Sequence, residues 1–398
     1  MAYDFDKVID RRGTDSSKWD GNPGVTAPGV TYPVDRDILP LWVADMDFEV
    51  APEITEALQR RVKHGIFGYT LVPDSCYDAI IAWEEKRHGW RIKKEWITFT
   101  PGAVSAAHMA VQAYCQVGDS AIVQTPVYYP FFRTVRNNGG ILSYNHMRRV
   151  GDRCEMDLED FERKAADPRT TFFILCSPHN PVGRVWSREE LQRVGEICMK
   201  HGLRVFADEL HCDLIMPGNT HFPFAGLSPE FAARSVTVIA PSKTFNLAGL
   251  QATVTIIPDP EMRRRFENVK ARNSLSNPNL FAITAMEAAY AHGEKWLDEV
   301  LAYIKGNYDF LVQYMKEKLP KVKVMPLEGT YLAWMDFSAV ESDEKVLQKR
   351  MMTGAKVWLD EGWIFGQGGE GFERLVLACP RSIIKEAVDR MAGEFARG

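Results

Sequence analysis

Short apolar runs alternate with stretches of helical periodicity over residues 51–290 of the chain. The runs are rich in β-branched and aromatic residues and are largely apolar on both faces: WITFT, SAIVQ, TTFFILC, LRVFA, SVTVIA and ATVTII. Amphipathic helical patterns separate several of them, such as GAVSAAHMAVQAYCQ and SREELQRVGEICMKHG. Such strands, alternating with helices, are typical of a mostly parallel sheet covered by helices on both faces. We therefore predict a large α/β domain over residues 51–290.

The ends of two helices can be read from the sequence. APEITEALQRRVKHG, residues 51–65, has a proline in its first turn and a glycine at its end, which predicts a helix. DSCYDAIIAWEEKRHG predicts the next helix, with Asp74 as its N-cap residue.

The two ends of the chain follow other patterns. EKWLDEVLAYIKGNYDFLVQYMKEKL, residues 294–319, predicts one long helix, and the strands TYLAWMDF and ERLVLA follow it with helices between and after them. Residues 291–398 are therefore expected to form a smaller α+β domain. Residues 1–50 are irregular and rich in Pro, Gly and Asp. We expect them to form an N-terminal arm that joins the small domain in part or wraps onto a partner subunit.

Composition restricts the class of protein. Of the 398 residues, 45% are hydrophobic and 25% are charged, and the net charge is −5, which is typical of a globular protein and disfavours nucleic-acid binding. No apolar run reaches the ~18 residues of a membrane span, and the first residues lack the apolar stretch of a signal peptide. The seven cysteines are widely spaced without a C-x-x-C pair, so we expect reduced thiols, no metal site and a cytoplasmic location.

Polar or aromatic residues follow several of the predicted strands directly. A Pro-Gly turn and helix start, PGAVSAA, follow ITFT, and an aromatic loop, TPVYYPFF, follows SAIVQ. Asn180, Asp208 and Lys243 come soon after TTFFILC, LRVFA and SVTVIA. Each feature alone has an ordinary structural explanation: a helix start, packing aromatics, a turn, a capping acid or a lysine at a strand end. Because ligands bind at the carboxyl ends of parallel strands, we interpret their joint occurrence as one site.

This set of groups fits pyridoxal phosphate. The cofactor needs an amine for its aldehyde, a carboxylate opposite its ring nitrogen, a cradle for its phosphate and a partner that stacks on its ring. The sequence therefore predicts a pyridoxal-phosphate site around Lys243 and Asp208.

Several motifs resemble those of one enzyme family. SPHNPVGRVW, ADELHCDL, APSKTFNLAGLQ and ACPRS resemble the fold type I pyridoxal-phosphate enzymes, the aspartate aminotransferase superfamily. LPLWVADMDFEVAPEITEAL, FGYT, EGTYLAWMDF and GEGFERLVLACPRS resemble more narrowly the MalY/PatB group of cystathionine β-lyases, which cleave carbon–sulfur bonds. The resemblance extends over essentially the whole chain. It implies the fold of that superfamily and a homodimer with shared active sites.

The resemblance implies roles for the residues around the cofactor ring. Lys243 would bind the cofactor covalently and then shuttle the Cα proton, and Asp208 would pair with the ring nitrogen. Asn180 and His211 would contact the ring hydroxyl, and Asn180 would also face the substrate. Tyr128 would stack on the ring.

The resemblance also implies contacts to the phosphate and to the substrate. Ala103 and Val104 would offer backbone N–H groups to the phosphate, and Ser242 would add its hydroxyl. Tyr69 would reach the phosphate in the other subunit, and Arg381 would bind the substrate carboxylate through two hydrogen bonds. Two positions depart from the aminotransferase pattern and leave the phosphate contacts less defined: Gln251 stands where an arginine is common, and Ala240 where serine or threonine is common.

The function implied by the resemblance is α,β-elimination, which releases a thiol, pyruvate and ammonia from a sulfur amino acid such as cystathionine. An aminotransferase shares the first steps, and no motif separates the two on physical grounds, so transamination is the alternative. A binding protein without catalysis is a more distant one, disfavoured by Lys243 and Asp208. GQGGEG, residues 366–371, satisfies G-x-G-x-x-G, but a strand pattern follows it, which disfavours a dinucleotide site. We interpret it as a mobile glycine-rich loop near Arg381 that closes over the substrate.

Overall fold

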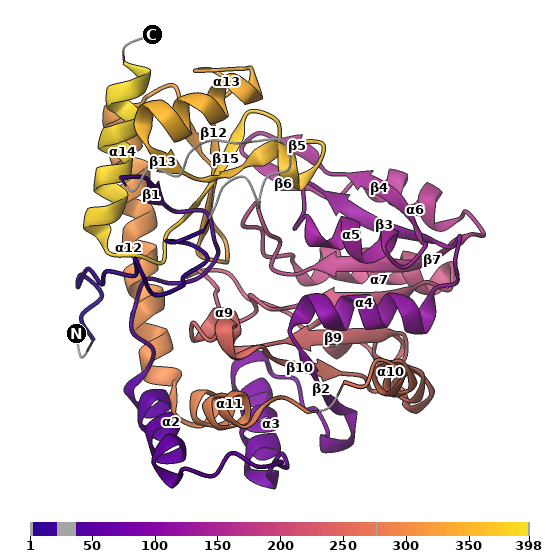
Figure 1. Ribbon diagram of the computed structural model, residues 1–398. Helices are drawn as coiled ribbons and strands as arrows, with labels where there is room; N and C mark the ends of the chain where they lie inside the picture. Colours follow the sequence, from indigo (N-terminus) through magenta and orange to yellow (C-terminus); the bar gives the residue numbers. More distant parts are fainter. Residues whose placement is uncertain (1–2, 22–36, 276, 397–398) are drawn as a thin grey trace.

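A seven-stranded sheet forms the centre of the large domain in this computed structural model, which describes residues 3–21, 37–275 and 277–396 (Figure 1). Its strand order is β2-β10-β9-β8-β7-β3-β4. The strands are β2 (Ile97–Pro101), β3 (Ser120–Thr125), β4 (Ile141–His146), β7 (Thr170–Cys176), β8 (Arg204–Asp208), β9 (Ser235–Ile239) and β10 (Ala252–Ile256). β10 runs antiparallel to both of its neighbours, and the other pairs are parallel. The mostly parallel sheet expected from the sequence is confirmed.

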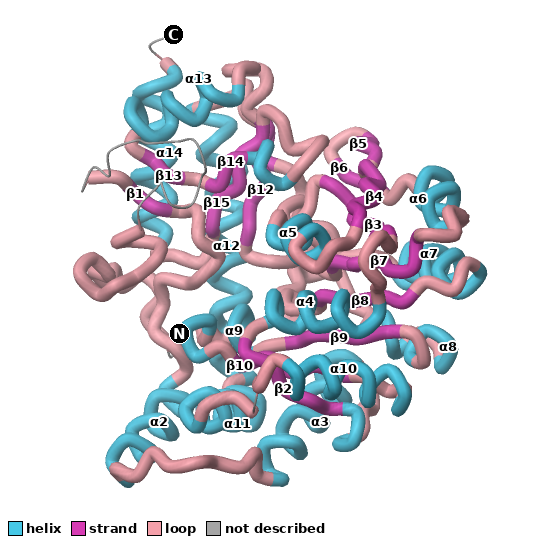
Figure 2. Tube along the Cα trace, turned by 45° about the vertical axis from the view of Figure 1, so that its right-hand side comes forward, coloured by secondary structure: helices cyan, strands magenta, loops and turns pink. Residues whose placement is uncertain are grey.

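Helices cover both faces of this sheet. The helices of the large domain are α2 (Pro52–His64), α3 (Asp74–His88), α4 (Ala103–Tyr114), α5 (Pro130–Arg136), α6 (Leu158–Ala165), α7 (Arg188–Lys200), α8 (Pro229–Ala232), α9 (Pro241–Thr244), α10 (Pro260–Arg272) and α11 (Leu280–His292), of which α2 and α3 pack against α11. Successive residues of a strand point to opposite faces. Accordingly, Phe172 and Ile174 of β7 pack with α4, α5 and α10, whereas Phe173 and Leu175 pack with α6 and α7. Figure 2 shows α4 and α5 in front of the strands.

A four-stranded antiparallel sheet, in the order β11-β12-β15-β14, forms the centre of the small domain. Its strands are β11 (Lys323–Val324), β12 (Leu332–Asp336), β14 (Asp360–Glu361) and β15 (Phe372–Val376), and its helices are α12 (Glu294–Lys318), α13 (Glu344–Lys349) and α14 (Arg381–Phe395). The long helix α12 extends from beside α11 into this domain (Figure 1). Part of the N-terminal segment joins it, because β1 (Leu39–Pro40) pairs in parallel with β13 (Val357–Trp358).

Short elements complete the described chain. They are the hairpin strands β5 (Arg148–Val150) and β6 (Arg153–Glu155), the 3₁₀ turns η1 (Lys94–Trp96), η2 (Phe224–Gly226), η3 (Ala248–Leu250) and η5 (Gly362–Phe365), and the π-helical turn η4 (Arg350–Ala355). The predicted domain boundaries, residues 1–50, 51–290 and 291–398, stay a prediction, and residues 1–2 and 22–36 of the N-terminal arm lie outside the described residues.

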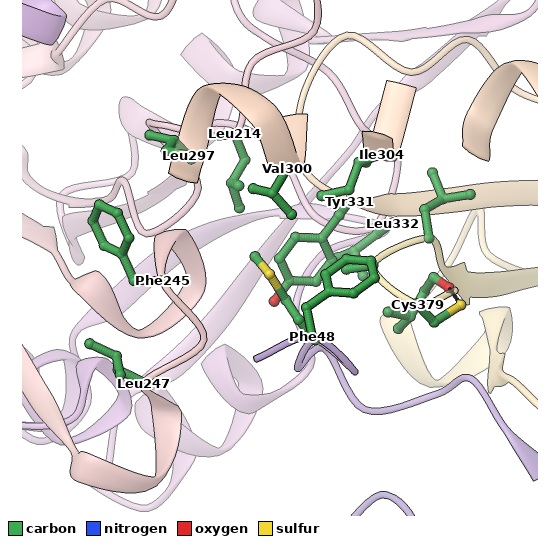
Figure 3. Packing of buried hydrophobic residues seen from close by; sticks show 14 of the residues in the cluster. Phe48, Leu214, Phe245, Leu247, Leu297, Val300, Ile304, Tyr331, Leu332 and Cys379 are labelled. Carbon is green, nitrogen blue, oxygen red and sulfur yellow. Dashed lines mark hydrogen bonds between the residues drawn. The ribbon is translucent and has the colours of Figure 1, made fainter. Parts of the chain in front are cut away.

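One hydrophobic cluster continues from the large domain into the small domain (Figure 3). Leu214 lies beyond β8 and Phe245 lies directly after α9, so both belong to segments that carry predicted site residues. They share the cluster with Phe48 of the N-terminal segment and with Tyr331 and Leu332 of the small domain. Burying each such side chain contributes about 1.5–3 kcal/mol. The cluster therefore holds the segments of the site against the small domain.

The predictions for individual helices and for their N-cap residue have different outcomes. α2 and α12 confirm the helices expected over residues 51–65 and 294–319. The assignment of Asp74 as the N-cap of α3 was wrong: Pro73 occupies that position, and no side chain caps the helix. The Asp74 carboxylate instead forms an ion pair with Lys94, because a cation lies within its reach. Among the described residues, no helix is both long and apolar enough to cross a membrane.

Candidate active site

A cavity of about 330 Å³ lies at the carboxyl ends of β2, β7 and β8. Pro101, Cys176 and Asp208, the last residues of these strands, line it. The turn of Lys243 follows β9, the neighbour of β8 in the sheet, and lines the same cavity. The parallel sheet thus brings residues that are far apart in sequence to one edge.

Lys243 lies in the four-residue turn α9. Its Nζ atom donates a hydrogen bond to the carbonyl oxygen of Ala44 at 2.7 Å. Burial lowers the pKa of Lys243 to about 8, and the positive charge of Arg374 adds to this effect. The negative charges of Asp45 and Asp208 partly oppose it. An amine with this pKa is half neutral near pH 8, as a nucleophile or a general base requires.

Asp208 ends β8 and His211 lies in the turn that follows, and both are buried. Burial raises the pKa of Asp208 to about 6, although the Leu210 amide, which donates to Oδ1 at 3.2 Å, and the charge of Lys243 oppose this rise. Burial also lowers the pKa of His211, so its imidazole is neutral. Its Nδ1 atom is buried and has no hydrogen-bond partner among the described residues. The turn therefore presents an acid and a neutral imidazole to the cavity.

Asn180 and Tyr128 complete the cavity beside β7 and β3. The two residues are joined through the backbone, since the Tyr128 amide donates to the Asn180 carbonyl at 3.1 Å. The Tyr128 ring packs edge-to-face against Phe131 with 5.6 Å between ring centroids. Tyr128 of the aromatic loop and Asn180, both predicted from the sequence, are thus hydrogen-bonded neighbours that line the same cavity.

The helix start predicted to suit a phosphate is the N-terminus of α4. Gly102 is its N-cap, with a φ of 90° that favours glycine, and no side chain caps the helix. Ala103 and Val104 line the cavity, and first-turn N–H groups have no partners within a helix. Ser242 and Gln251 line the same cavity. This end of the cavity suits an anion.

Arg381 does not line the cavity. It begins α14, and its Nε atom donates to Oδ1 of Asn307 at 3.1 Å, while its guanidinium lies 5.4 Å from the ring centroid of Tyr303. These contacts direct the side chain to α12 rather than to the residues around Lys243.

Arg374 of β15 does not line the cavity either, but it contacts Asn180, which does. It is 3% exposed, and its Nη1 atom donates to Oδ1 of Asn180 at 3.1 Å. Its Nη2 atom donates to the Trp42 carbonyl at 2.7 Å and to the carboxylate of Asp360. Its Nε atom has no partner among the described residues. Sequence reasoning missed this residue, although a positive charge inside the otherwise largely apolar run FERLVLA was a signal for it.

Two other predicted features lie outside the cavity. Tyr69 is exposed in the segment between α2 and α3, next to the exposed side chains of Phe67 and Leu71. Residues 366–371 form a loop between η5 and β15, so a strand rather than a helix follows the glycines. The closure of this loop over the substrate stays a prediction.

One group of buried side chains among the described residues has the spacing of metal ligands. The ligand atoms of Glu84, His88 and Cys212 all lie within 4.8 Å of one another. None of the three lines the cavity.

The chain belongs to the family described as aminotransferase class I and II, which matches residues 36–391. Within that family it is 48% identical to cystathionine beta-lyase PatB of Bacillus subtilis, over 97% of this chain and 98% of that protein. It is 32% identical to Protein MalY of Escherichia coli, over 97% of each protein. The family and the narrower group that the motifs resemble are confirmed.

Solved structures share the fold over nearly the whole chain. Cystalysin from Treponema denticola, which contains a pyridoxal 5'-phosphate cofactor, has a TM-score of 0.95 and 36% identity over 100% of both chains. The pyridoxal-phosphate-bound C-S lyase from Staphylococcus hominis has a TM-score of 0.91 and 29% identity over 99% of this chain and 98% of that one.

Proposed function

We propose that this protein is a pyridoxal-phosphate-dependent carbon–sulfur β-lyase, which cleaves a sulfur amino acid such as cystathionine into a thiol, pyruvate and ammonia. The observation that carries this proposal is that Lys243 and Asp208, an amine and an acid, line one cavity. The similarity to PatB, named a cystathionine beta-lyase, and to the lyase from Staphylococcus hominis supports the choice of reaction.

The residues around the cavity fit the cofactor. Lys243 offers the amine, Asp208 offers a carboxylate to the ring nitrogen, and the unpartnered Nδ1 of His211 can bond the ring hydroxyl. Tyr128 offers an aromatic face, and the first turn of α4 with Ser242 offers donors to the phosphate. When bound, pyridoxal phosphate supplies an aldehyde that captures the substrate amine and a ring that withdraws electrons from the substrate Cα.

The residues of the site then perform the proton transfers. With the cofactor bound, the free amine of Lys243 would remove the Cα proton as a general base, and the Ala44 carbonyl accepts a hydrogen bond from this amine. Asp208 would hold the ring nitrogen in its protonated form, and this opposite charge would lower the pKa of Asp208 that burial raises. Arg374 and Asn180 bind the substrate carboxylate.

Transamination is the second candidate function. A protein from Clostridium difficile described as a putative aminotransferase has a TM-score of 0.94 and 40% identity over 99% of this chain, and the family itself carries that name. The two reactions share the removal of the Cα proton by Lys243. They differ in whether the proton returns to the cofactor or the electrons expel sulfur.

The first experiment separates these functions. Purified protein supplied with pyridoxal phosphate should be yellow, and borohydride should attach the cofactor to Lys243, as peptide mass analysis would show. Incubation with cystathionine alone should yield pyruvate and a thiol. Product that forms only when a keto acid is added would identify an aminotransferase instead.

A homodimer with shared active sites is part of the proposal. Ile66, Phe67, Tyr69 and Leu71 are exposed apolar or aromatic side chains in one segment, which is typical of an interface. We assign this segment to contact with a second copy, where Tyr69 would reach the phosphate of the other site. A mixture of Lys243→Ala and Tyr69→Phe chains would test this, because only a mixed dimer contains one intact site. A cytoplasmic location and the absence of membrane and nucleic-acid partners stay predictions.

A further inference from the structure

A cluster of buried polar side chains outside the cavity is centred on Asp213, which is 3% exposed. Its carboxylate accepts three hydrogen bonds. The Nε1 atom of Trp83 and the Nε2 atom of His88 each lie 3.0 Å from Oδ1. The hydroxyl of Thr244 donates to Oδ2 at 2.8 Å. Every oxygen of this buried acid therefore has a partner.

These bonds join three segments of the chain. Trp83 and His88 belong to α3, and Thr244 directly follows Lys243. Asp213 ends the turn, residues 208–213, that begins at the last residue of β8. One carboxylate thus connects the two turns that carry the amine and the acid of the site.

The carboxylate of Asp213 is ionised. Burial alone would raise its pKa, but the hydrogen bonds that it accepts and the charge of His88 lower it below its ordinary value. Burial also works against a charge on His88, yet the nearby carboxyl groups of Glu84 and Asp213 raise its pKa to about 9. At neutral pH a protonated His88 and an ionised Asp213 form a buried ion pair.

His88 also belongs to the group that has the spacing of metal ligands, with Glu84 and Cys212. Burial raises the pKa of Glu84 to about 8, and the positive charge of His88 opposes this rise. Among the described residues, the hydrogen bond of the His88 ring goes to Asp213 and not to either of these two neighbours.

We propose that Asp213 is a positioning residue for the reaction. Through Thr244, it fixes the Lys243 amine relative to the carboxylate of Asp208. The inference rests on the proposed function, in which these two groups must reach different parts of one cofactor. Because reacting atoms need close alignment, a small shift between the two turns slows the reaction but still allows the cofactor and the substrate to bind.

Substitutions at Thr244 test the connection. Thr244→Val removes the hydroxyl and keeps a similar shape, whereas Thr244→Ser keeps the hydroxyl. The first readout is the rate at which cofactor-free protein captures pyridoxal phosphate, followed by absorbance and borohydride trapping. The second is kcat and KM for cystathionine. Thr244→Val should slow cofactor capture and lower kcat by about 10- to 100-fold with little change in KM. Thr244→Ser should keep a capture rate and a kcat close to those of the wild type.

A matched control separates positioning from stability. Tyr114→Phe removes another buried hydrogen bond of 2.8 Å, from the Tyr114 hydroxyl to the Met262 carbonyl, away from the site. It should lower the thermal stability as Thr244→Val does and leave the capture rate unchanged. Asp213→Asn, which keeps the shape and removes the charge, should slow capture at least as much as Thr244→Val. Equal capture rates for Thr244→Val and Tyr114→Phe would overturn the proposal.

Failure of the proposed function would look different. A wild-type protein that captures no cofactor at Lys243 would contradict both proposals, whereas normal wild-type capture with an unaffected Thr244→Val variant would contradict the positioning role alone.

Discussion

The two sides of the cavity are built in different ways. On the large-domain side, Asp208 ends β8 and Lys243 follows β9, and these two strands are paired in one sheet whose register sets the spacing of the two residues. On the other side, Arg374 reaches Asn180 from the small-domain sheet, and Ala44 reaches Lys243 from the N-terminal segment. The positions of the residues on the large-domain side are set by one sheet. The positions of those on the other side are set by how separate parts of the chain pack.

This difference suggests a division of roles. Groups that must react with a cofactor need the fixed geometry of one framework. Groups that bind the substrate can lie on a separate sheet and be altered without disturbing that framework. We expect substitutions on the large-domain side to affect the chemistry and those on the small-domain side to affect substrate binding.

Replacing Lys243 should have the largest effect. Lys243→Ala removes the amine that we propose binds the cofactor and moves the Cα proton, so kcat should fall at least about 10²- to 10⁴-fold and borohydride should attach no cofactor. Lys270→Ala is the control, because Lys270 is also a buried lysine but bonds Thr98 at 3.1 Å outside the cavity. Cofactor that still becomes attached in Lys243→Ala would place the reactive amine elsewhere.

Substitution of the two arginines should separate binding from chemistry. Arg374→Lys keeps the charge but loses the planar fork, so kcat/KM for cystathionine should fall about 100-fold, mainly through KM. Arg381→Lys should change kcat/KM little, because the partners of Arg381 lie outside the cavity. Steady-state kinetics of both variants decide the question. A large loss in Arg381→Lys alone would restore the assignment made from the sequence.

The large-domain side could be predicted because its signals are local. Asn180, Asp208 and Lys243 each follow an apolar run of strand length, and parallel strands place their carboxyl ends at one edge. The N-terminus of α4 was predicted for the same reason. These signals do not depend on how the two domains pack against each other.

The small-domain side could not be predicted in this way. Arg374 and Arg381 lie close together in sequence, and only the pairing of Arg374 with Trp334 and Asp360 across neighbouring strands determines which of them faces the cavity region. The contact of Ala44 with Lys243 joins segments that no local pattern connects. Such contacts depend on the packing of whole domains.

The charges around Lys243 provide a smaller test. Asp45→Asn removes a negative charge that raises the pKa of Lys243, so this pKa should fall below the wild-type value of about 8. The neutral amine then forms at lower pH, and capture of pyridoxal phosphate by the cofactor-free protein should be faster at neutral pH, by less than about tenfold. The pH dependence of the capture rate measures the shift. A shift toward higher pH would contradict the electrostatic account.

The smallest effect is expected where the β5–β6 hairpin meets the small domain. Arg149 bonds Asp336 at 2.8 Å, and because the arginine side chain is 41% exposed, the pair contributes only about 0.2–1 kcal/mol. Arg149→Met should therefore raise KM by less than about fivefold, and added salt should reduce the difference.

Arg148→Met is the matched control for this last prediction, because Arg148 lies on the same hairpin but faces Asp157 of the large domain at 3.8 Å. It should leave KM unchanged. Neither variant should alter the rate of cofactor capture, since the sheet that positions Lys243 is intact in both. If Arg149→Met slowed capture while Arg148→Met did not, the small domain would control the chemistry as well as the binding, and the division of roles between the two sides would fail.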